Sequence, residues 1–112
     1  MSRLLDVLTV SDLCVDLVLR GNVRPRFGQV EQLVDGYHLE LGGSANLFAS
    51  QYARLGGRCG VVGYTGRDAF GRLARERLSL AGVDVTRLRE HPELPTGLGL
   101  ALAEPQDRAT LT

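Results

Sequence analysis

The residues best suited to chemistry form a short run, Gly42-Gly43-Ser44-Ala45-Asn46, which directly precedes a helical pattern. Two adjacent glycines let the backbone come close to a ligand because no Cβ atom is in the way. The first turn of a helix also leaves backbone N–H groups without partners inside the helix. The Asn46 amide adds a hydrogen-bond donor and an acceptor at the same place. This combination suits a small ligand with several hydroxyl groups, although a glycine pair is also common as a plain turn before a helix.

Several other polar residues have both a functional and a structural interpretation. A carboxylate such as Asp16 can accept two hydrogen bonds from neighbouring hydroxyl groups, or it can be a solvated aspartate at the end of a strand. Asn46 could be a helix-capping residue, and Asp68 is predicted to be the N-cap of a second helix rather than a ligand residue. Thr96 is as compatible with the start of a strand as with a ligand contact. The residue types indicate a binding site and leave the role of each member open.

The elements that must position these residues follow from the hydrophobic pattern. The apolar run that includes Val7, Leu8 and Val10 predicts a buried strand near the N-terminus. A solvent-facing strand with many polar residues is expected further along, before the glycine pair. The predicted strands lie at 7–10, 13–17, 30–41, 59–64, 83–88, 97–103 and 108–112, and the predicted helices run from 45 to 55 and from 68 to about 81.

Both predicted helices carry a wide apolar face and end at glycine, at Gly56-Gly57 and at Gly82. Phe48, Tyr52 and Phe70 lie on these faces and are expected to pack in the core. The order strand, hairpin, helix, strand, helix, strand, hairpin predicts an α/β layer with a few extra strands set aside. So small a sheet would leave edges and faces uncovered, and we expect the sequence to be the front portion of a longer protein.

Composition narrows the classes of function. The 112 residues carry a formal net charge of zero, so nothing indicates nucleic acid or a membrane surface as a partner. All thirteen Lys or Arg positions are arginine, which excludes a catalytic or phosphate-loop lysine within this chain. Cys14 and Cys59 are expected to be free thiols in a reducing cytoplasm, and with His38 and His91 they lack the spacing of a metal site. Neither a secretory leader nor a membrane span is expected.

Four segments are more informative as an ordered set than any of them is alone. They are Val10-Ser11-Asp12-Leu13-Cys14-Val15-Asp16, the 42–46 run with its helix ending in Leu55-Gly56, Gly66-Arg67-Asp68-Ala69-Phe70-Gly71, and Pro95-Thr96-Gly97. Together they resemble the motifs of the ribokinase/PfkB family of carbohydrate kinases over nearly the whole chain. In this resemblance Asp16 matches the sugar-binding aspartate of the family, and Cys14 stands where ribokinase-like members have asparagine. The substrate-binding residues implied by the resemblance are Asp12, Asp16, Gly42, Gly43, Asn46 and Thr96.

The resemblance also implies a fold. It is an α/β, ribokinase-like Rossmann-type layered sheet with a small β-strand lid, and it is incomplete in this chain. Residues 1–112 are expected to form the N-terminal part of a single kinase domain, the sugar-binding half, with lid strands near 13–22, 30–41 and 97–112. In relatives such strands often pair between subunits, so a homodimer through the lid is compatible with the resemblance.

Members of this family transfer the γ-phosphoryl group of ATP to a sugar hydroxyl in the presence of Mg²⁺. Their catalytic aspartate and ATP pocket lie in C-terminal motifs that residues 1–112 do not contain. We therefore expect this cytoplasmic chain to bind the acceptor sugar, to hold no catalytic, cofactor-binding or metal-binding residue, and to be inactive alone. Two alternatives stay open: a nucleoside kinase of the adenosine-kinase type, and a non-catalytic sugar-binding remnant. A dinucleotide fingerprint and a nucleophile elbow are both absent.

Overall fold

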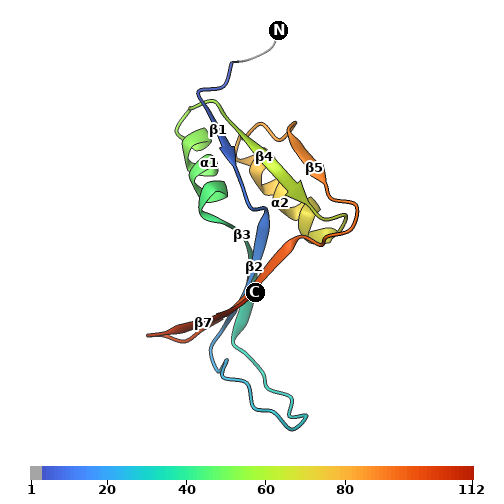
Figure 1. Ribbon diagram of the computed structural model, residues 1–112. Helices are drawn as coiled ribbons and strands as arrows, with labels where there is room; N and C mark the ends of the chain where they lie inside the picture. Colours follow the sequence, from blue (N-terminus) through green and yellow to red (C-terminus); the bar gives the residue numbers. More distant parts are fainter. Residues whose placement is uncertain (1–3) are drawn as a thin grey trace.

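Residues 4–112 are described by the computed structural model of the chain. They form an α/β body and an elongated second sheet that extends away from it (Figure 1). The elements in chain order are β1 (Val7–Val10), β2 (Cys14–Arg20), β3 (Gly36–Gly42), α1 (Ser44–Arg54), β4 (Cys59–Thr65), α2 (Ala69–Leu80), β5 (Leu88–Glu90), β6 (Gly97–Ala103) and β7 (Arg108–Leu111). This arrangement confirms the predicted α/β class. Neither of the helices in the described part is long and apolar enough to cross a membrane.

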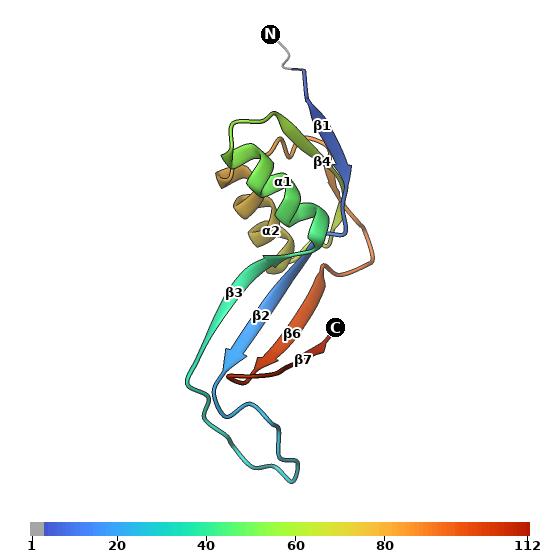
Figure 2. The same ribbon diagram turned by 90° about the vertical axis from the view of Figure 1, so that its left-hand side faces the viewer.

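The body is built on a parallel sheet with the strand order β1-β4-β5. Val7 pairs with Cys59, and Gly63 pairs with Leu88, which fixes the register of the two strand pairs. Both helices lie on the same face of this sheet (Figure 2). Right-handed crossovers that step in one direction along a sheet place their helices on one side. Within residues 4–112 the opposite face of the parallel sheet is therefore left without a helical cover.

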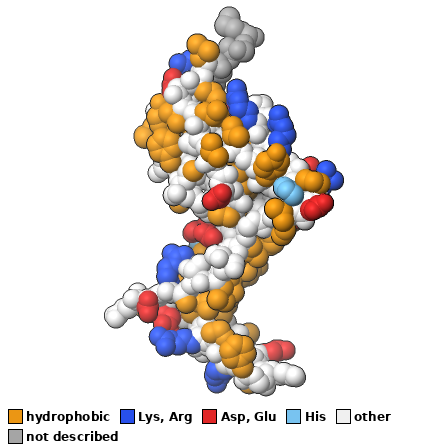
Figure 3. Space-filling model, in the orientation of Figure 1, with side chains coloured by type: hydrophobic (Ala, Val, Ile, Leu, Met, Phe, Trp, Pro, Cys, Tyr) orange, Lys and Arg blue, Asp and Glu red, His pale blue; other side chains and the backbone are white. Residues whose placement is uncertain are grey.

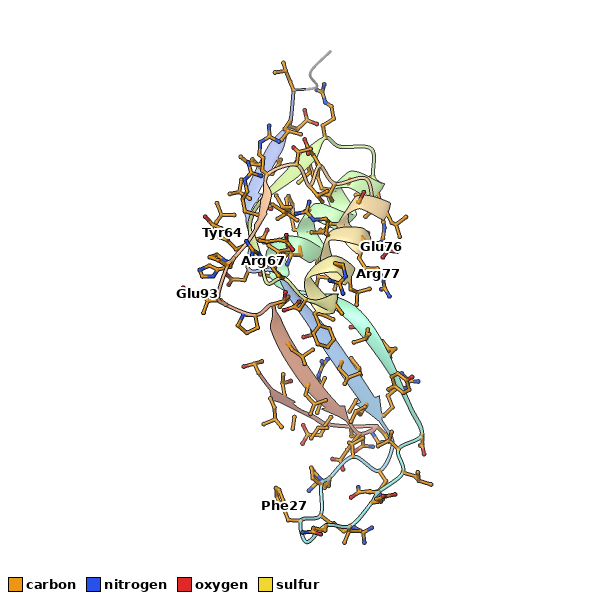
Figure 4. All side chains as sticks on the ribbon, turned by 90° about the vertical axis from the view of Figure 1, so that its right-hand side faces the viewer. Phe27, Tyr64, Arg67, Glu76, Arg77 and Glu93 are labelled. Carbon is orange, nitrogen blue, oxygen red and sulfur yellow. The ribbon has the colours of Figure 1, made fainter. Side chains whose placement is uncertain are left out.

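The second sheet has the order β3-β2-β6-β7. Strands β2 and β6 run parallel, whereas β3 and β7 are antiparallel to their neighbours. Because side chains alternate between the two faces of a strand, Asp16 and Val18 share one face while Leu17 and Leu19 share the other. The 21–35 connection between β2 and β3 extends beyond this sheet, and Phe27 lies at its tip with 96% of its surface exposed (Figure 4).

The core lies between the helices and the face of the parallel sheet that they cover. Its fully buried side chains include Val61 from β4, Leu78 from α2 and Val15 from β2. Because Val15 belongs to the second sheet, the core continues from the body into the base of that sheet. Tyr52 and Phe70 pack against this core, as predicted.

Three apolar residues that the sequence predicted to be buried are instead exposed: Leu8 to 50%, Val10 to 84% and Phe48 to 48%. Leu8 and Val10 point to the uncovered face of the parallel sheet, because alternate residues of β1 face opposite sides. Figure 3 views the body from that side and shows hydrophobic side chains gathered on it. Phe48 lies on the outer part of α1, where its ring stacks at a tilt on Tyr52 with 5.7 Å between centroids.

Two predicted strands are shorter than expected. The strand predicted over 30–41 begins only at Gly36, because residues 30–35 belong to an irregular connection. The strand predicted over 83–88 is replaced by a single bridge at Asp84, and β5 begins only at Leu88. The Asp84 carboxylate accepts hydrogen bonds from the backbone N–H and the hydroxyl of Thr86, which turns the chain before β5.

Candidate functional site

The predicted binding residues come together where the second sheet joins the body. Asp12 follows the carboxyl end of β1, and Gly66 follows the carboxyl end of β4; Arg67, the next residue, marks this level in Figure 4. Ligands of open α/β sheets bind beyond the carboxyl ends of the strands. Residues 12–16, 42–46 and 96–99 meet here, and we call this region the junction site.

Asp16 lies between two glycines of the junction site. It is opposite Gly99 in the parallel pair of β2 and β6. A Cβ atom at Gly42 would come within 3.1 Å of Asp16 Oδ2, and a Cβ atom at Gly99 would overlap Asp16 Oδ1. Within residues 4–112 the half-buried Asp16 carboxylate has no hydrogen bond or ion pair. Both of its oxygens are therefore available to accept hydrogen bonds from a ligand.

The glycine pair forms the corner between β3 and α1. Gly43 is the N-cap of α1 and has φ 85°, a left-handed conformation that favours glycine. A Cβ atom at Gly43 would lie 2.7 Å from Asn46 Nδ2 and 2.9 Å from the Asp12 carbonyl oxygen. No side chain of residues 4–112 caps the first turn of α1. The corner therefore brings backbone close to Asp12 and leaves the N-terminus of the helix without a capping group from the described residues.

Asn46 is fully buried beneath this corner. Its Nδ2 donates hydrogen bonds to the carbonyl oxygens of Asp12, at 2.8 Å, and of Gly42, at 2.9 Å. It is therefore not the helix cap but a bridge between the β1–β2 connection and the end of β3. Its Oδ1 is buried with no partner among the described residues. Asp16 and Asn46 thus both lie close to Gly42: the Asp16 carboxylate near its Cα, and the Asn46 amide at its carbonyl oxygen.

Cys14 and Asp12 also border the junction site. A Cβ atom at Gly42 would lie 2.9 Å from Cys14 Sγ. Burial raises the pKa of the Cys14 thiol, and the charges of Asp16 and Asp12 raise it further. The thiol is therefore neutral at physiological pH and acts as a small, weakly polar wall. The Asp12 side chain is exposed, while its carbonyl oxygen is held by Asn46.

Thr96 lies at the same junction, and its hydroxyl is engaged with protein groups. It donates to Asp68 Oδ1 at 2.7 Å and accepts from the Gly66 N–H at 2.8 Å. The Thr96 N–H donates to Asp68 Oδ2 at 2.9 Å. Asp68 also caps α2 by accepting from the Gly71 N–H at 2.8 Å, which confirms the predicted N-cap. The hydrogen bonds from Thr96 and Gly71 lower the pKa of Asp68.

Sequence reasoning missed three residues that face the same side as Asp16. Gly99 makes room for the carboxylate, and its signal was the alternation of Gly97 and Gly99 in a predicted strand. Glu40 is directly opposite Asp16 on β3. His38 bonds to Glu40 through Nε2 and to Arg20 through Nδ1, so that a polar row continues from Asp16 along this face.

The other end of the body has a different character. A cavity of about 550 Å³ lies at the amino ends of β1 and β4, away from the junction site. Its two cations are already paired, Arg58 with Asp6 at 3.0 Å and Arg87 with Asp84 at 3.1 Å. Across residues 4–112 no three His, Cys, Asp or Glu residues gather to hold a metal ion.

The junction site thus lies at the carboxyl edge of an open α/β sheet, with a second sheet beside it. Residues 5–112 match the pfkB family of carbohydrate kinases, and the chain belongs to that family. It is similar to the aminoimidazole riboside kinase of Salmonella typhimurium, with 44% identity over 57 residues, which are 51% of this chain and 18% of that protein.

Solved structures show the same fold. The ribokinase of Arabidopsis thaliana in complex with ribose and ATP matches 94% of this chain with a TM-score of 0.83 and 22% identity. A ribokinase II structure from E. coli, in its apo form, matches 96% with a TM-score of 0.79 and 26% identity. The chain covers 34% of each of these two structures, and thus spans about a third of their length.

Proposed function

We propose that this chain supplies the acceptor-binding part of a protein that transfers the γ-phosphoryl group of ATP to a sugar hydroxyl. The observation that carries the proposal is the Asp16 carboxylate, which lies between Gly42 and Gly99 and has no partner among residues 4–112. Membership in the pfkB family of carbohydrate kinases supports the reaction class.

Each residue of the junction site has a role in this proposal. Asp16 accepts hydrogen bonds from two neighbouring hydroxyl groups of the sugar. Gly42 and Gly43 let the sugar approach the backbone. Asn46 holds the corner in place by its bonds to Asp12 and Gly42. Its Oδ1 is buried, and direct contact between Asn46 and the sugar stays a prediction.

Asp12 and Thr96 complete the proposed set of binding residues. Asp12 presents an exposed carboxylate at the edge of the junction site. The Thr96 hydroxyl already has a donor and an acceptor partner in the protein, so its contribution is to hold the start of β6. Direct contact between Thr96 and the sugar stays a prediction.

We place the catalytic base, the ATP pocket and the Mg²⁺ ligands outside residues 1–112. This placement follows the family resemblance, in which the catalytic aspartate and the ATP pocket lie in C-terminal motifs, and it is supported by membership in the pfkB family. Phosphoryl transfer depends mainly on positioning and on charge stabilisation. This chain provides positioning of the acceptor, and we expect it to have no kinase activity alone.

A riboside is the second candidate acceptor. The similarity to an aminoimidazole riboside kinase favours it, and the similarity to a ribokinase bound to ribose favours a free sugar. Both acceptors contain a ribose ring, whose vicinal hydroxyls suit Asp16. A non-catalytic sugar-binding remnant would use the same residues, and reading the gene beyond Thr112 for an acidic, glycine-rich motif distinguishes it from a kinase.

We assign the lid function to the second sheet, β3-β2-β6-β7. We also propose that the protein is located in the cytoplasm. The sheet carries Asp16 on one face and reaches well beyond the junction site (Figure 2). Closure of such a sheet over the sugar would exclude water from the reaction. Its exposed apolar residues include Tyr37, Leu98 and Leu111, which are suited to contact a second copy in a homodimer.

The test of the proposal is sugar binding by the 112-residue chain. Isothermal titration with ribose, fructose, a ketodeoxysugar acid and adenosine measures the dissociation constants for the two acceptor classes. Asp16→Asn is expected to weaken the best ligand about tenfold or more, because it replaces an ionic acceptor by a neutral amide. Asp107→Asn, at the distant β6–β7 turn, is the matched control and leaves binding unchanged. Equal binding by wild type and Asp16→Asn would contradict the proposal.

A further inference from the structure

A tight hydrogen-bonded group joins helix α2 to the start of β6. It consists of Asp68, Thr96 and the Gly66 N–H, and we call it the junction clamp. Its bonds span 28 residues between Asp68 and Thr96, and 30 residues between Gly66 and Thr96. Thr96 is only 6% exposed. The clamp therefore fixes one end of the second sheet to the body through buried contacts.

We propose that Asp68 is a positioning residue for acceptor binding, which acts through Thr96 and β6 on the Asp16 carboxylate. This inference rests on the proposed function. Asp68 itself contacts no ligand in this account, because all three of its hydrogen bonds go to the Thr96 N–H, the Thr96 hydroxyl and the Gly71 N–H.

The connection from the clamp to Asp16 follows the strand register. Thr96 directly precedes β6, whose Gly97 pairs with Cys14 and whose Gly99 pairs with Asp16. The space for Asp16 Oδ1 exists only because Gly99 has no Cβ atom. A displacement of the start of β6 therefore moves the backbone that borders the Asp16 carboxylate.

The packing around the clamp leaves it little freedom to shift. A Cβ atom at Gly66 would come within 2.5 Å of the Thr96 backbone nitrogen. A Cβ atom at Gly71 would come within 2.5 Å of the Gly66 oxygen and within 2.9 Å of Thr96 Oγ1. Gly66 is thus in close contact with the backbone of Thr96 and with Gly71, while the Asp68 and Thr96 side chains fill the space beside them. Interiors packed in this way transmit strain.

Asp84 provides a matched control with the same local chemistry. Its Oδ1 accepts from the Thr86 N–H at 2.9 Å and from the Thr86 hydroxyl at 2.7 Å. These bonds close a turn between residues two apart, near the amino ends of the body strands. Asp84 also pairs with Arg87 through Oδ2 at 3.1 Å, whereas Asp68 links α2 to the start of β6.

The experiment compares Asp68→Asn with Asp84→Asn in the 112-residue chain. In Asp68→Asn the amide oxygen can replace only one of the two carboxylate oxygens. With this oxygen at the position of Oδ1, the new NH2 group faces the Thr96 N–H, and two hydrogen-bond donors oppose each other where Oδ2 accepted a bond. Ribose and adenosine affinities are measured by titration, and hydrogen exchange is measured at the Gly97 and Gly99 amides. We expect Asp68→Asn to weaken the better ligand about tenfold and to speed exchange at both amides. Asp84→Asn is expected to change neither.

A second pair of variants covers the case in which Asp68→Asn does not fold. Thr96→Ser keeps the hydroxyl, whereas Thr96→Val keeps the shape without it. We expect the serine variant, which keeps the hydroxyl, to bind the ligand more tightly than the valine variant. Rescue by serine would not follow from a loss of packing alone, since serine removes more side-chain volume than valine does.

The outcomes separate this inference from the proposed function. The inference would be overturned if Asp68→Asn and Asp84→Asn changed ligand binding and amide exchange equally. It would also be overturned if Thr96→Val bound the ligand as tightly as the wild-type chain. If the wild-type chain binds neither ribose nor adenosine, the proposed function fails and the inference fails with it, while exchange at Gly97 and Gly99 still reports whether the clamp holds β6.

Discussion

Asp16 on β2 and Gly99 on β6 are direct neighbours in a parallel strand pair, and the Asp16 carboxylate fills the space that a Cβ atom at position 99 would need. On its other side Asp16 is bordered by Gly42, whose own Cβ would lie 3.1 Å from Oδ2. The position of the carboxylate thus depends on two absent side chains. Gly42 and Gly99 are therefore as important for the position of the carboxylate as Asp16 itself.

Gly99→Ala is expected to abolish acceptor binding while it costs little stability. The new methyl group would overlap the end of the Asp16 side chain, which can rotate away without a backbone shift. Titration with ribose should show at least about a tenfold loss of affinity. Gly56→Ala is the control: it has a positive φ of 96° and open space around it, so it should lower stability and leave binding unchanged.

Asn46→Ala is expected to destabilise the chain by about 1–3 kcal/mol, because the carbonyl oxygens of Asp12 and Gly42 lose their shared donor. Urea unfolding followed by circular dichroism measures this change in the free energy of unfolding. Asn22→Ala, at an exposed position, should stay within about 0.5 kcal/mol of wild type. Equal stability of the two variants would contradict the bridging role of Asn46.

Stability should fall in acid partly through Asp68. The hydrogen bonds from Thr96, and then that from Gly71, hold the pKa of Asp68 below its ordinary value of 3.8. The stabilisation is therefore complete above the ordinary pKa and is lost as the pH falls through the lower pKa of the folded state. Free energies of unfolding measured from pH 6 downward should decline less steeply in Asp68→Asn than in wild type. Identical slopes for the two proteins would refute this.

The Cys14 thiol should react slowly with iodoacetamide near neutral pH. Burial raises its pKa first, and the negative charges of Asp16 and Asp12 raise it further, so less thiolate is present. Asp16→Asn removes one of these charges and should speed alkylation, whereas Asp107→Asn should not. Bound ribose should slow the reaction of wild type. Peptide mass spectrometry separates labelling at Cys14 from labelling at the buried Cys59.

Local signals in the sequence were enough to place both helices. The apolar spacing and the Asp68 cap located α2, and the glycine pair located the start of α1. The family motifs also predicted that Asp16 and Asn46 belong to one neighbourhood. These features depend on contacts between residues close in sequence, or on an order of motifs that can be read directly.

The pairing of strands that are far apart in the sequence could not be predicted from such local signals. The position of Gly99 beside Asp16 depends on the parallel register of two strands far apart in the sequence, and a slip of one residue would place other side chains there. An apolar run such as that of β1 also looks the same whether one or both faces are covered, and so Leu8 and Val10 were wrongly expected to be buried. The bridging bonds of Asn46 could not be predicted either, because its two carbonyl partners become neighbours only in the folded chain.

The most direct measurement is the ¹³C resonance of the Asp16 side-chain carboxylate in the 112-residue chain during titration with ribose and with adenosine. Direct hydrogen bonding to the acceptor predicts a saturable shift of the Asp16 Cγ signal that follows the binding isotherm, while the Asp107 signal stays in place. Binding that leaves the Asp16 signal unmoved, or the absence of any binding, would contradict the account.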